Sequence, residues 1–248
     1  SFGLPCPSVV TIYDMIGRRF PETLSRRGRL LYRAAMGLAV ARADGIITIS
    51  ESARADLLRA YGPPAPVAIT PLAADRRFRP RPPAEIAALR ERYNLPARYA
   101  LYLGSNKPHK NLERLVLAWE MGSEGWGAGS GEPEVALVLA GHEARREDPL
   151  RELVAGRGLG GRVRFLPNLA DADLPALYSG ALLFAFPSFY EGFGLPPLEA
   201  MACGVPVLCA NRSSLPEVVG DAAITVDPYS VEAIAGGLRR LLGDPALR

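Results

Sequence analysis

Long apolar runs and cysteines are scarce in this sequence of 248 residues, and both absences limit what the chain can be. No apolar run approaches the roughly 20 residues that a helix needs to cross a bilayer, because residues 180–186 are too few, so no transmembrane segment is expected. The three cysteines, Cys6, Cys203 and Cys209, are odd in number and lack zinc-ligand spacing. They indicate reduced thiols in a cytoplasmic protein, with no disulfide framework and no metal site.

Lysine and the usual features of a chain start are scarce as well. Only Lys107 and Lys110 are lysines among the 29 basic residues, which indicates a compositional bias toward arginine and makes two lysines in one loop informative. The sequence lacks an initiator methionine and a signal-peptide n-region and ends inside a helical pattern, so we interpret it as a fragment cut at both ends. Its hydrophobic content of 48% and charged content of 22% are ordinary for a globular protein of one large or two modest domains.

Apolar runs alternate with helical patterns along the chain, which predicts an α/β fold with parallel sheets. Residues 1–72 contain only three expected strands, at 7–12, 45–49 and 67–70, which we interpret as the second half of an N-terminal Rossmann-like domain. Residues 73–96 begin rich in Pro and Arg and are expected to be a linker. Residues 97–248 predict a complete, doubly wound C-terminal Rossmann-like domain. Its expected strands are 99–103, 135–140, 163–166, 182–186, 205–209 and 223–226, and its expected helices are 111–121, 149–155, 171–178, 196–203, 215–219 and one from 230.

The stretch 189–204, FYEGFGLPPLEAMACG, combines a glycine turn with a helix start directly after an expected strand. Gly192 and Gly194 allow backbone angles that other residues avoid and let the main chain approach a ligand closely. Two prolines suit a first helical turn, so a helix is expected from about residue 196 to Gly204. The free amides of the turn and of the helix start form an expected anion site for a phosphate or for sugar hydroxyls. These residues are Gly192, Phe193, Gly194 and Leu195.

Two glutamates frame this turn at the carboxyl end of an expected strand, where an open α/β sheet binds its ligands. Glu199 lies about one turn into the helix, so its two oxygens can match the vicinal diol of a ribose. Glu191 precedes the glycines and would face whatever lies beyond the phosphates. The alternative is that Glu191 is a solvated loop residue and that Glu199 is an acid favoured near a helix N-terminus. The position at a strand end favours the ligand-binding interpretation.

This stretch resembles the E-x7-E motif of the retaining glycosyltransferases of family 4, the group 1 glycosyltransferases with a GT-B fold of two facing Rossmann-like domains. The similarity is continuous over residues 187–223, PSFYEGFGLPPLEAMACGVPVLCANRSSLPEVVGDAA, and looser over nearly the whole chain. It implies a metal-independent enzyme without a cofactor that moves a mannose- or glucose-type hexose from a nucleotide diphosphate sugar to an acceptor hydroxyl in glycan, polysaccharide or glycolipid synthesis. It also implies that Glu191 holds the donor sugar in catalysis, that Glu199 holds the ribose, and that no carboxylate acts as a nucleophile.

The loop 104–111, GSNKPHKN, also follows an expected strand and precedes an expected helix, so it lies at the same edge of the sheet. Lys110 can neutralise a diphosphate there, and the alternative is a solvated lysine at a helix start. The loop resembles the family segment in which an Arg and, five residues later, a Lys hold the donor pyrophosphate. Lys110 occupies the Lys position but Ser105 the Arg position, so Lys107 or His109 is the candidate for the second positive charge. The resemblance implies that Gly104, Ser105, Lys107 and Lys110 bind the donor and that Lys110 also acts in catalysis.

Further candidates follow other strands. His142 follows the expected strand 135–140 and can contact the donor, although a polar strand cap is the more ordinary role. Asn168 and Leu169 resemble the family segment that meets the nucleobase through backbone groups. Tyr13 and Asp14 resemble an acceptor-side segment in which a His often stands at the Tyr13 position, and the alternative is a strand-end cap.

The resemblance implies a nucleotide-sugar donor and a glycan or lipid-linked acceptor as partners, and no nucleic acid. Residues 18–42 carry seven arginines in a helical pattern that can dock on an anionic membrane, although a solvated helix face is the plainer explanation. Two alternatives to a transferase remain open. One is a nucleotide-sugar epimerase of related fold, which would need further acid and base carboxylates. The other is an inactive nucleotide-sugar binder, which the changes at Ser105 and Tyr13 suggest.

Overall fold

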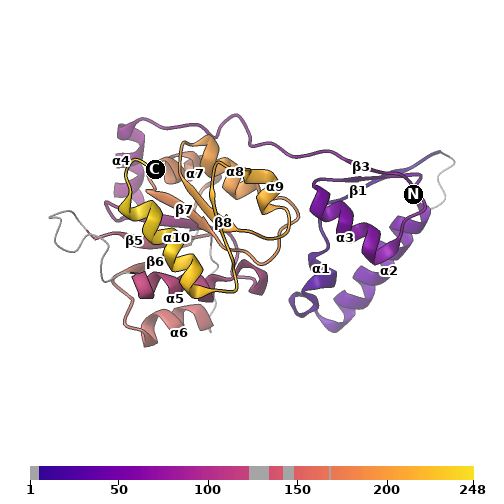
Figure 1. The fold of residues 1–248 in the computed structure, drawn as a ribbon, viewed down its shortest axis with the longest axis horizontal. Coiled ribbons are helices and arrows are strands. Elements are labelled where there is room, and N and C mark those ends of the chain that lie inside the picture. The colour runs from indigo at the N-terminus through magenta and orange to yellow at the C-terminus, as the bar shows by residue number, and fades with distance from the viewer. Residues whose placement is uncertain (1–5, 123–133, 142–147, 168) are drawn as a thin grey trace. The chain divides into compact units, whose positions relative to one another are not determined.

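The computed structural model describes residues 6–122, 134–141, 148–167 and 169–248 (Figure 1). The chain forms two compact units. The first unit comprises Ser1–Ala73, Tyr190–Gly194 and Arg212–Val218, and the second comprises Ala74–Phe189, Leu195–Asn211 and Val219–Arg248. The glycine turn of the E-x7-E stretch therefore belongs to the first unit, whereas the strand before it and the helix after it belong to the second.

The first unit is built on a parallel three-stranded sheet in the order β1 (Val9–Ile12), β2 (Gly45–Thr48) and β3 (Val67–Ile69). These are the three strands expected from the sequence. The basic pattern of residues 18–42 divides into shorter elements, because Ser25 accepts a hydrogen bond from the Gly28 amide and so begins a new helix. The helical elements before β3 are α1 (Ile16–Arg19), the 3-10 turn η1 (Pro21–Thr23), α2 (Arg26–Arg42) and α3 (Glu51–Tyr61).

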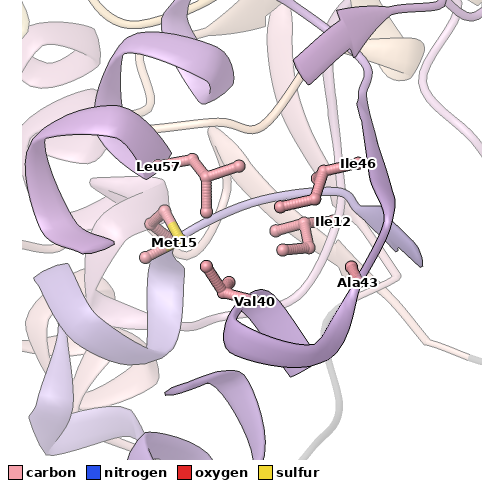
Figure 2. Packing of buried hydrophobic residues seen from close by; sticks show 6 residues of the cluster. All are labelled: Ile12, Met15, Val40, Ala43, Ile46 and Leu57. Carbon is pink, nitrogen blue, oxygen red and sulfur yellow. The ribbon is translucent and has the colours of Figure 1, made fainter. Parts of the chain in front are cut away.

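Apolar side chains from β1, β2, α2 and α3 meet in the core of the first unit, and Figure 2 shows them pointing toward one another. Leu57 of α3 is fully buried, and Ile46 of β2 is only 1% exposed. Fully burying an aliphatic side chain stabilises a fold by about 1.5–3 kcal/mol, so this cluster holds the helices on the sheet. Its members are Ile12, Met15, Val40, Ala43, Ile46 and Leu57.

Helix α2 also carries apolar residues that lie outside this core. Leu30 and Leu31 are 73% and 71% exposed, and Leu38 is 37% exposed. The helix contains five arginines and no acidic residue. It therefore presents large apolar side chains among positive charges to its surroundings.

The second unit is built on six parallel strands in the order β6-β5-β4-β7-β8-β9. The chain runs outward from β4 to β6 and then returns to the other side of β4 to form β7, β8 and β9. The direction changes between β4 and β7, so ligands are expected beyond the carboxyl ends of these two strands. All six expected strands are present: β4 (Tyr99–Leu103), β5 (Ala136–Ala140), β6 (Val163–Leu166), β7 (Leu183–Phe186), β8 (Val207–Ala210) and β9 (Ile224–Val226).

The helices of the second unit pack in two groups (Figure 1). Helix α5 (Leu112–Gly122) contacts α6 (Pro149–Gly156) and α10 (Val231–Gly243). Helix α7 (Leu174–Ser179), which follows the 3-10 turn η4 (Asp171–Asp173), contacts α4 (Pro83–Tyr93) and α8 (Leu195–Ala202). The short α9 (Leu215–Val219) falls almost entirely within the first unit. The expected α/β class with parallel sheets is confirmed.

Residues 73–96, expected as a linker, contain the helix α4 and belong to the second unit from Ala74 onward. Pro83 opens this helix, where a proline costs no hydrogen bond, and Leu89 is buried beneath it. The helix was not expected because the region begins rich in Pro and Arg, and its helical pattern starts only at residue 83.

Candidate functional site

The strands β4 and β5 are both followed by a glycine because their carboxyl ends run close together. Gly104, after β4, has φ +152°, and a Cβ atom there would lie 2.7 Å from the Tyr102 hydroxyl oxygen. Gly141, after β5, has φ +74°, and a Cβ atom there would lie 3.3 Å from the Gly104 carbonyl oxygen. Side chains are disfavoured at both positions, so backbone atoms form this edge of the sheet.

The loop after β4 brings a positive charge to the end of β7. Ser105 and Lys107 are exposed, and the Ser105 carbonyl accepts a hydrogen bond from the Tyr102 hydroxyl at 2.9 Å. Lys110 ends the 3-10 turn η2 (Pro108–Lys110), and its Nζ lies 4.9 Å from the centre of the Phe186 ring. Phe186 is the last residue of β7. Lys110 thus lies at the change of strand order, where the sequence predicts a bound diphosphate.

Asn111 holds this loop in place through side-chain hydrogen bonds to other loops, a role that the sequence does not reveal. It has a left-handed backbone, with φ 60°, and its side chain is buried. Its Nδ2 donates to the Pro187 carbonyl at 2.9 Å and to the Pro228 carbonyl at 2.7 Å. These two bonds join the loops that follow β4, β7 and β9. The tolerance of Asn for positive φ is a signal that could have marked the residue, but its partners are too distant in sequence to predict.

His109 lies between the two lysines and is 2% exposed. Burial, followed by the charges of Lys110 and Lys107, lowers the pKa of His109 to about 4. The imidazole is therefore neutral at pH 7 and adds no positive charge to the loop. Of the two candidates for the second positive charge of this loop, Lys107 is therefore the one that remains.

Helix α8 carries Glu199 and begins at Leu195, one residue before the expected start. Glu199 is partly buried, and its Oε2 accepts a hydrogen bond from the Tyr178 hydroxyl at 2.9 Å. Burial raises the pKa of Glu199, while the Tyr178 hydrogen bond and the charge of Arg77 act in the opposite direction. Burial also raises the pKa of Tyr178, so the phenol is neutral and acts as the donor. The sequence offered no signal for this tyrosine.

Glu191 lies in the first unit and is only 8% exposed, which argues against a solvated loop residue. Its amide donates to the Ser213 hydroxyl at 2.9 Å, and its carbonyl accepts from the Ser214 hydroxyl at 3.0 Å. The Ser214 hydroxyl also bonds the Phe193 carbonyl. Two adjacent serines before α9 therefore hold the backbone on both sides of Glu191 and orient the residue.

The two glycines of this turn are required for different reasons. Gly194 has φ +125°, as expected. Gly192 is not among the residues with positive φ; instead a Cβ atom there would lie 2.5 Å from the Tyr13 carbonyl oxygen and 2.7 Å from the Asp14 Cβ. The expectation of an unusual backbone angle at Gly192 is therefore wrong, and close approach of another backbone segment explains the glycine.

The family model of the glycosyl transferases group 1 matches residues 87–248. The chain belongs to this family. It is 40% identical over 205 residues to the O-antigen chain mannosyltransferase B of Escherichia coli, a match that covers 82% of this chain and 52% of the relative. This group 1 glycosyltransferase chain thus spans about half the length of the curated relative that it matches.

Two solved structures resemble the fold of the group 1 glycosyltransferase chain. The sucrose-phosphate synthase of Thermosynechococcus elongatus superposes with a TM-score of 0.77 at 27% identity, over 96% of this chain and 59% of that one. HepE of Anabaena, solved in complex with UDP and glucose, gives a TM-score of 0.77 at 23% identity over 96% of this chain and 62% of that one. Together with the family match, these likenesses confirm the expected GT-B fold.

Tyr190, next to the turn of this glycosyltransferase chain, and Glu217 of α9 each make a long-range contact within the first unit that the sequence does not predict. The Tyr190 hydroxyl accepts a hydrogen bond from the Met15 amide at 3.3 Å. The Glu217 carboxylate accepts from the amides of Glu51 and Ser52 at 2.9 and 3.0 Å, and so caps α3. A capping acid supplied from more than 160 residues away leaves no local sequence signal.

On the acceptor side, Tyr13 is 56% exposed, and the carboxylate of Asp14 accepts a hydrogen bond from the Ile16 amide at 2.8 Å. This bond closes a short turn between β1 and the first residue of α1. Leu169 is partly buried, three residues beyond the end of β6. His142 and Asn168, also predicted donor contacts, lie outside the described residues.

Within the described ranges of the glycosyltransferase chain, no three His, Cys, Asp or Glu side chains come together in a way that could hold a metal ion. No helix in the same ranges combines the length and the apolar character needed to cross a bilayer.

Proposed function

We propose that the protein transfers a mannose- or glucose-type hexose from a nucleotide diphosphate sugar to an acceptor hydroxyl, with retention of the anomeric configuration. The observation that carries the proposal is the position of Lys110, whose ammonium lies against the last residue of β7 at the change of strand order. A cation fixed there suits the diphosphate that leaves when a glycosidic bond breaks. The 40% identity to a mannosyltransferase of O-antigen chains supports a mannose-type sugar and a glycan or lipid-linked acceptor.

The roles proposed for the other residues are those that the family resemblance implies. The amides at the start of α8 add partial positive charge for the same diphosphate. Glu199 accepts hydrogen bonds from the ribose, and Glu191, oriented by Ser213 and Ser214, binds hydroxyls of the donor sugar. The leaving diphosphate departs and the acceptor attacks on the same face of the sugar, so no carboxylate becomes glycosylated. The UDP and glucose bound to HepE, a protein of the same fold, support such a donor.

A transfer assay with the whole protein tests this function. Nucleotide diphosphate hexoses with different sugars and bases are incubated with a lipid-linked glycan acceptor, and the anomeric configuration of the product is read by NMR spectroscopy. Retention with a mannose- or glucose-type donor is expected. A product with the opposite configuration would refute the retaining mechanism. An epimerised nucleotide sugar, or tight binding without turnover, would favour the epimerase or the inactive binder instead.

The same assay with EDTA tests whether the reaction needs a divalent metal. Because Lys110 and the α8 amides are proposed to balance the diphosphate, transfer is expected to continue at an unchanged rate. Complete loss of transfer that Mg²⁺ or Mn²⁺ restores would contradict the proposed role of Lys110.

We also propose that α2 docks the protein on the anionic, cytoplasmic face of a membrane, where a lipid-linked acceptor would be found. The exposed Leu30 and Leu31 lie among five arginines in a helix without acidic residues. Such helices place apolar side chains in the lipid interface while their cations attract anionic headgroups by about 1 kcal/mol each.

Sedimentation with vesicles tests the docking. The whole protein should bind vesicles that contain phosphatidylglycerol and should be released by high salt. Replacing Leu30 and Leu31 by Ser should weaken the binding, whereas Leu58→Ser, at a residue of α3 that is 41% exposed, should not. Equal binding to neutral and anionic vesicles, or an equal loss of vesicle binding in all variants, would show that α2 does not dock the protein on the membrane.

A further inference from the structure

Tyr178 is held rigidly in the second unit by two aromatic neighbours. Its side chain is fully buried in α7. The ring of Phe78 lies 5.8 Å away at 74°, and the ring of Phe184 in β7 lies 5.3 Å away at 70°. Both are edge-to-face arrangements, which are favourable for aromatic pairs. The hydroxyl of Tyr178 therefore has one fixed position.

That position is directly against Glu199. The hydroxyl donates to Oε2 of Glu199 at 2.9 Å. Among the described residues, no side chain or amide donates to Oε1 of Glu199. One oxygen of the carboxylate is thus held by the protein, and the other can accept from a ligand.

Charged groups from two further segments act on the same carboxylate. Arg77 and Asp75 precede α4, and Asp171 lies in η4. Cys203 follows α8 near Tyr178, and burial raises the pKa of its thiol, so it is neutral and adds no charge. Burial and the two aspartates raise the pKa of Glu199, whereas Tyr178 and Arg77 lower it. Arg77 and Asp75 are exposed, so solvent screens them. Tyr178 is itself buried, and its hydrogen bond lowers the pKa of Glu199, which burial of the carboxylate raises.

We propose that Tyr178 is a positioning residue for donor binding, whose hydroxyl keeps Glu199 charged and oriented for the ribose hydroxyls. The inference rests on the proposed function, because it takes Glu199 as the ribose ligand. It adds that the affinity for a ribonucleotide depends on a residue that the ligand does not touch. Without the hydroxyl, Glu199 binds a proton at a higher pH, and a protonated carboxyl is a poorer acceptor for the diol.

The chain offers a matched control for this experiment. Tyr99 is as buried as Tyr178, and its hydroxyl donates at 2.7 Å to the carbonyl of Leu177, the residue before Tyr178. Tyr99→Phe and Tyr178→Phe each remove one buried tyrosine hydrogen bond in the same region. Only the second of these bonds reaches Glu199.

Calorimetry of the whole protein with a nucleoside diphosphate, from pH 5 to pH 8, is the measurement. Tyr178→Phe should weaken binding about tenfold at pH 7, the scale of a lost hydrogen bond to a charged group. It should also move the pH at which affinity falls to a higher value. The 2′,3′-dideoxy form of the nucleotide should bind Tyr178→Phe and the original protein equally, and Tyr99→Phe should change neither the affinity nor the pH profile.

The outcomes separate this inference from the proposed function. If Glu199→Gln binds the nucleotide as tightly as the original protein, the ribose role of Glu199 is wrong. If Glu199→Gln binds weakly but Tyr178→Phe keeps the original affinity and pH profile, and loses only as much thermal stability as Tyr99→Phe, then the Tyr178 bond is structural and the inference is overturned. Should Tyr178→Phe fail to fold, 3-fluorotyrosine at position 178 keeps the shape and donates more strongly. It should move the pH profile to lower values, and an unmoved profile would also overturn the inference.

Discussion

Replacing Lys110 by Met tests the charge that is proposed to hold the diphosphate. Met keeps an unbranched apolar stem against Phe186, over whose ring the ammonium lies at 4.9 Å, so mainly the charge is lost. Two unit charges about 4 Å apart interact by about 4 kcal/mol at an effective dielectric constant of about 20. Lys110 is only partly buried, and screening by solvent reduces this interaction. A loss of about 2–3 kcal/mol is therefore expected, or roughly 30- to 150-fold in affinity.

Calorimetry with free nucleoside diphosphate and with the intact nucleotide sugar measures this loss, which should be similar for both ligands because both carry the diphosphate. Turnover should fall by about 10²–10³, since charge develops on the leaving group in the transition state. Arg114→Met is the matched control, because the Arg114 guanidinium lies 5.3 Å from the centre of the Phe189 ring yet has no proposed contact with the donor. Lys110→Met with undiminished affinity for the diphosphate would refute the assignment.

Three further predictions concern the turn and the loop. Glu191→Ala should leave the affinity for free nucleoside diphosphate within about twofold while turnover falls by about 10²–10³, since its proposed contacts are with the sugar alone. Calorimetry that finds the diphosphate no longer bound by a folded variant would disprove the proposed order of ligand groups along the site. Gly192→Ala should lower the free energy of unfolding by about 1–3 kcal/mol in urea denaturation, because its Cβ would meet the Tyr13 carbonyl at 2.5 Å, whereas Gly243→Ala, where nothing lies within 4 Å, should be neutral or stabilising. His109 has a pKa of about 4 in the folded state, below the value of about 6.5 expected when unfolded, so the unfolded state binds the proton first and stability should fall as the pH drops from about 6.5 to 4. His109→Gln should make urea denaturation less dependent on pH in that window, and an unchanged dependence would show that the imidazole is not buried in its neutral form.

The elements that the sequence predicted well are those whose signals are local. The strand β7 and the helix α8 follow from an apolar run, a proline that ends it and a proline-rich helix start, all close together in the sequence. Both elements lie within about one residue of the expected bounds. The cap of α3 also has a local signal, because Ser50 is of a residue type favoured at a helix N-cap. The helix α4 was missed because the proline-rich sequence before it resembles a linker.

The charged residues of the candidate site could be predicted from the sequence. The residues whose hydrogen bonds hold them in place could not. Lys110 and Glu199 stand in recognisable motifs, but Asn111 and Tyr178 act through partners 76 and 21 residues away. Asn and Tyr are common in many surroundings, and only the folded chain shows which carbonyl or carboxylate they meet. The neutral state of His109 was equally hidden, because it depends on burial that the exposed Lys107 two residues before it does not suggest.

Ser50 uses both ends of one hydroxyl group, and this narrows the substitutions that the position can accept. Its oxygen accepts from the Ala53 amide at 3.0 Å as the cap of α3, while the same group donates to the Gly192 carbonyl at 2.7 Å. Asp is as good a helix cap as Ser, but its carboxylate has no proton to donate and would set a negative charge against that carbonyl. In a saturation library selected for activity, Asp at position 50 should therefore be depleted as strongly as Ala, and Thr should survive. Rules for capping a helix, applied to α3 alone, would rank these residues in the wrong order.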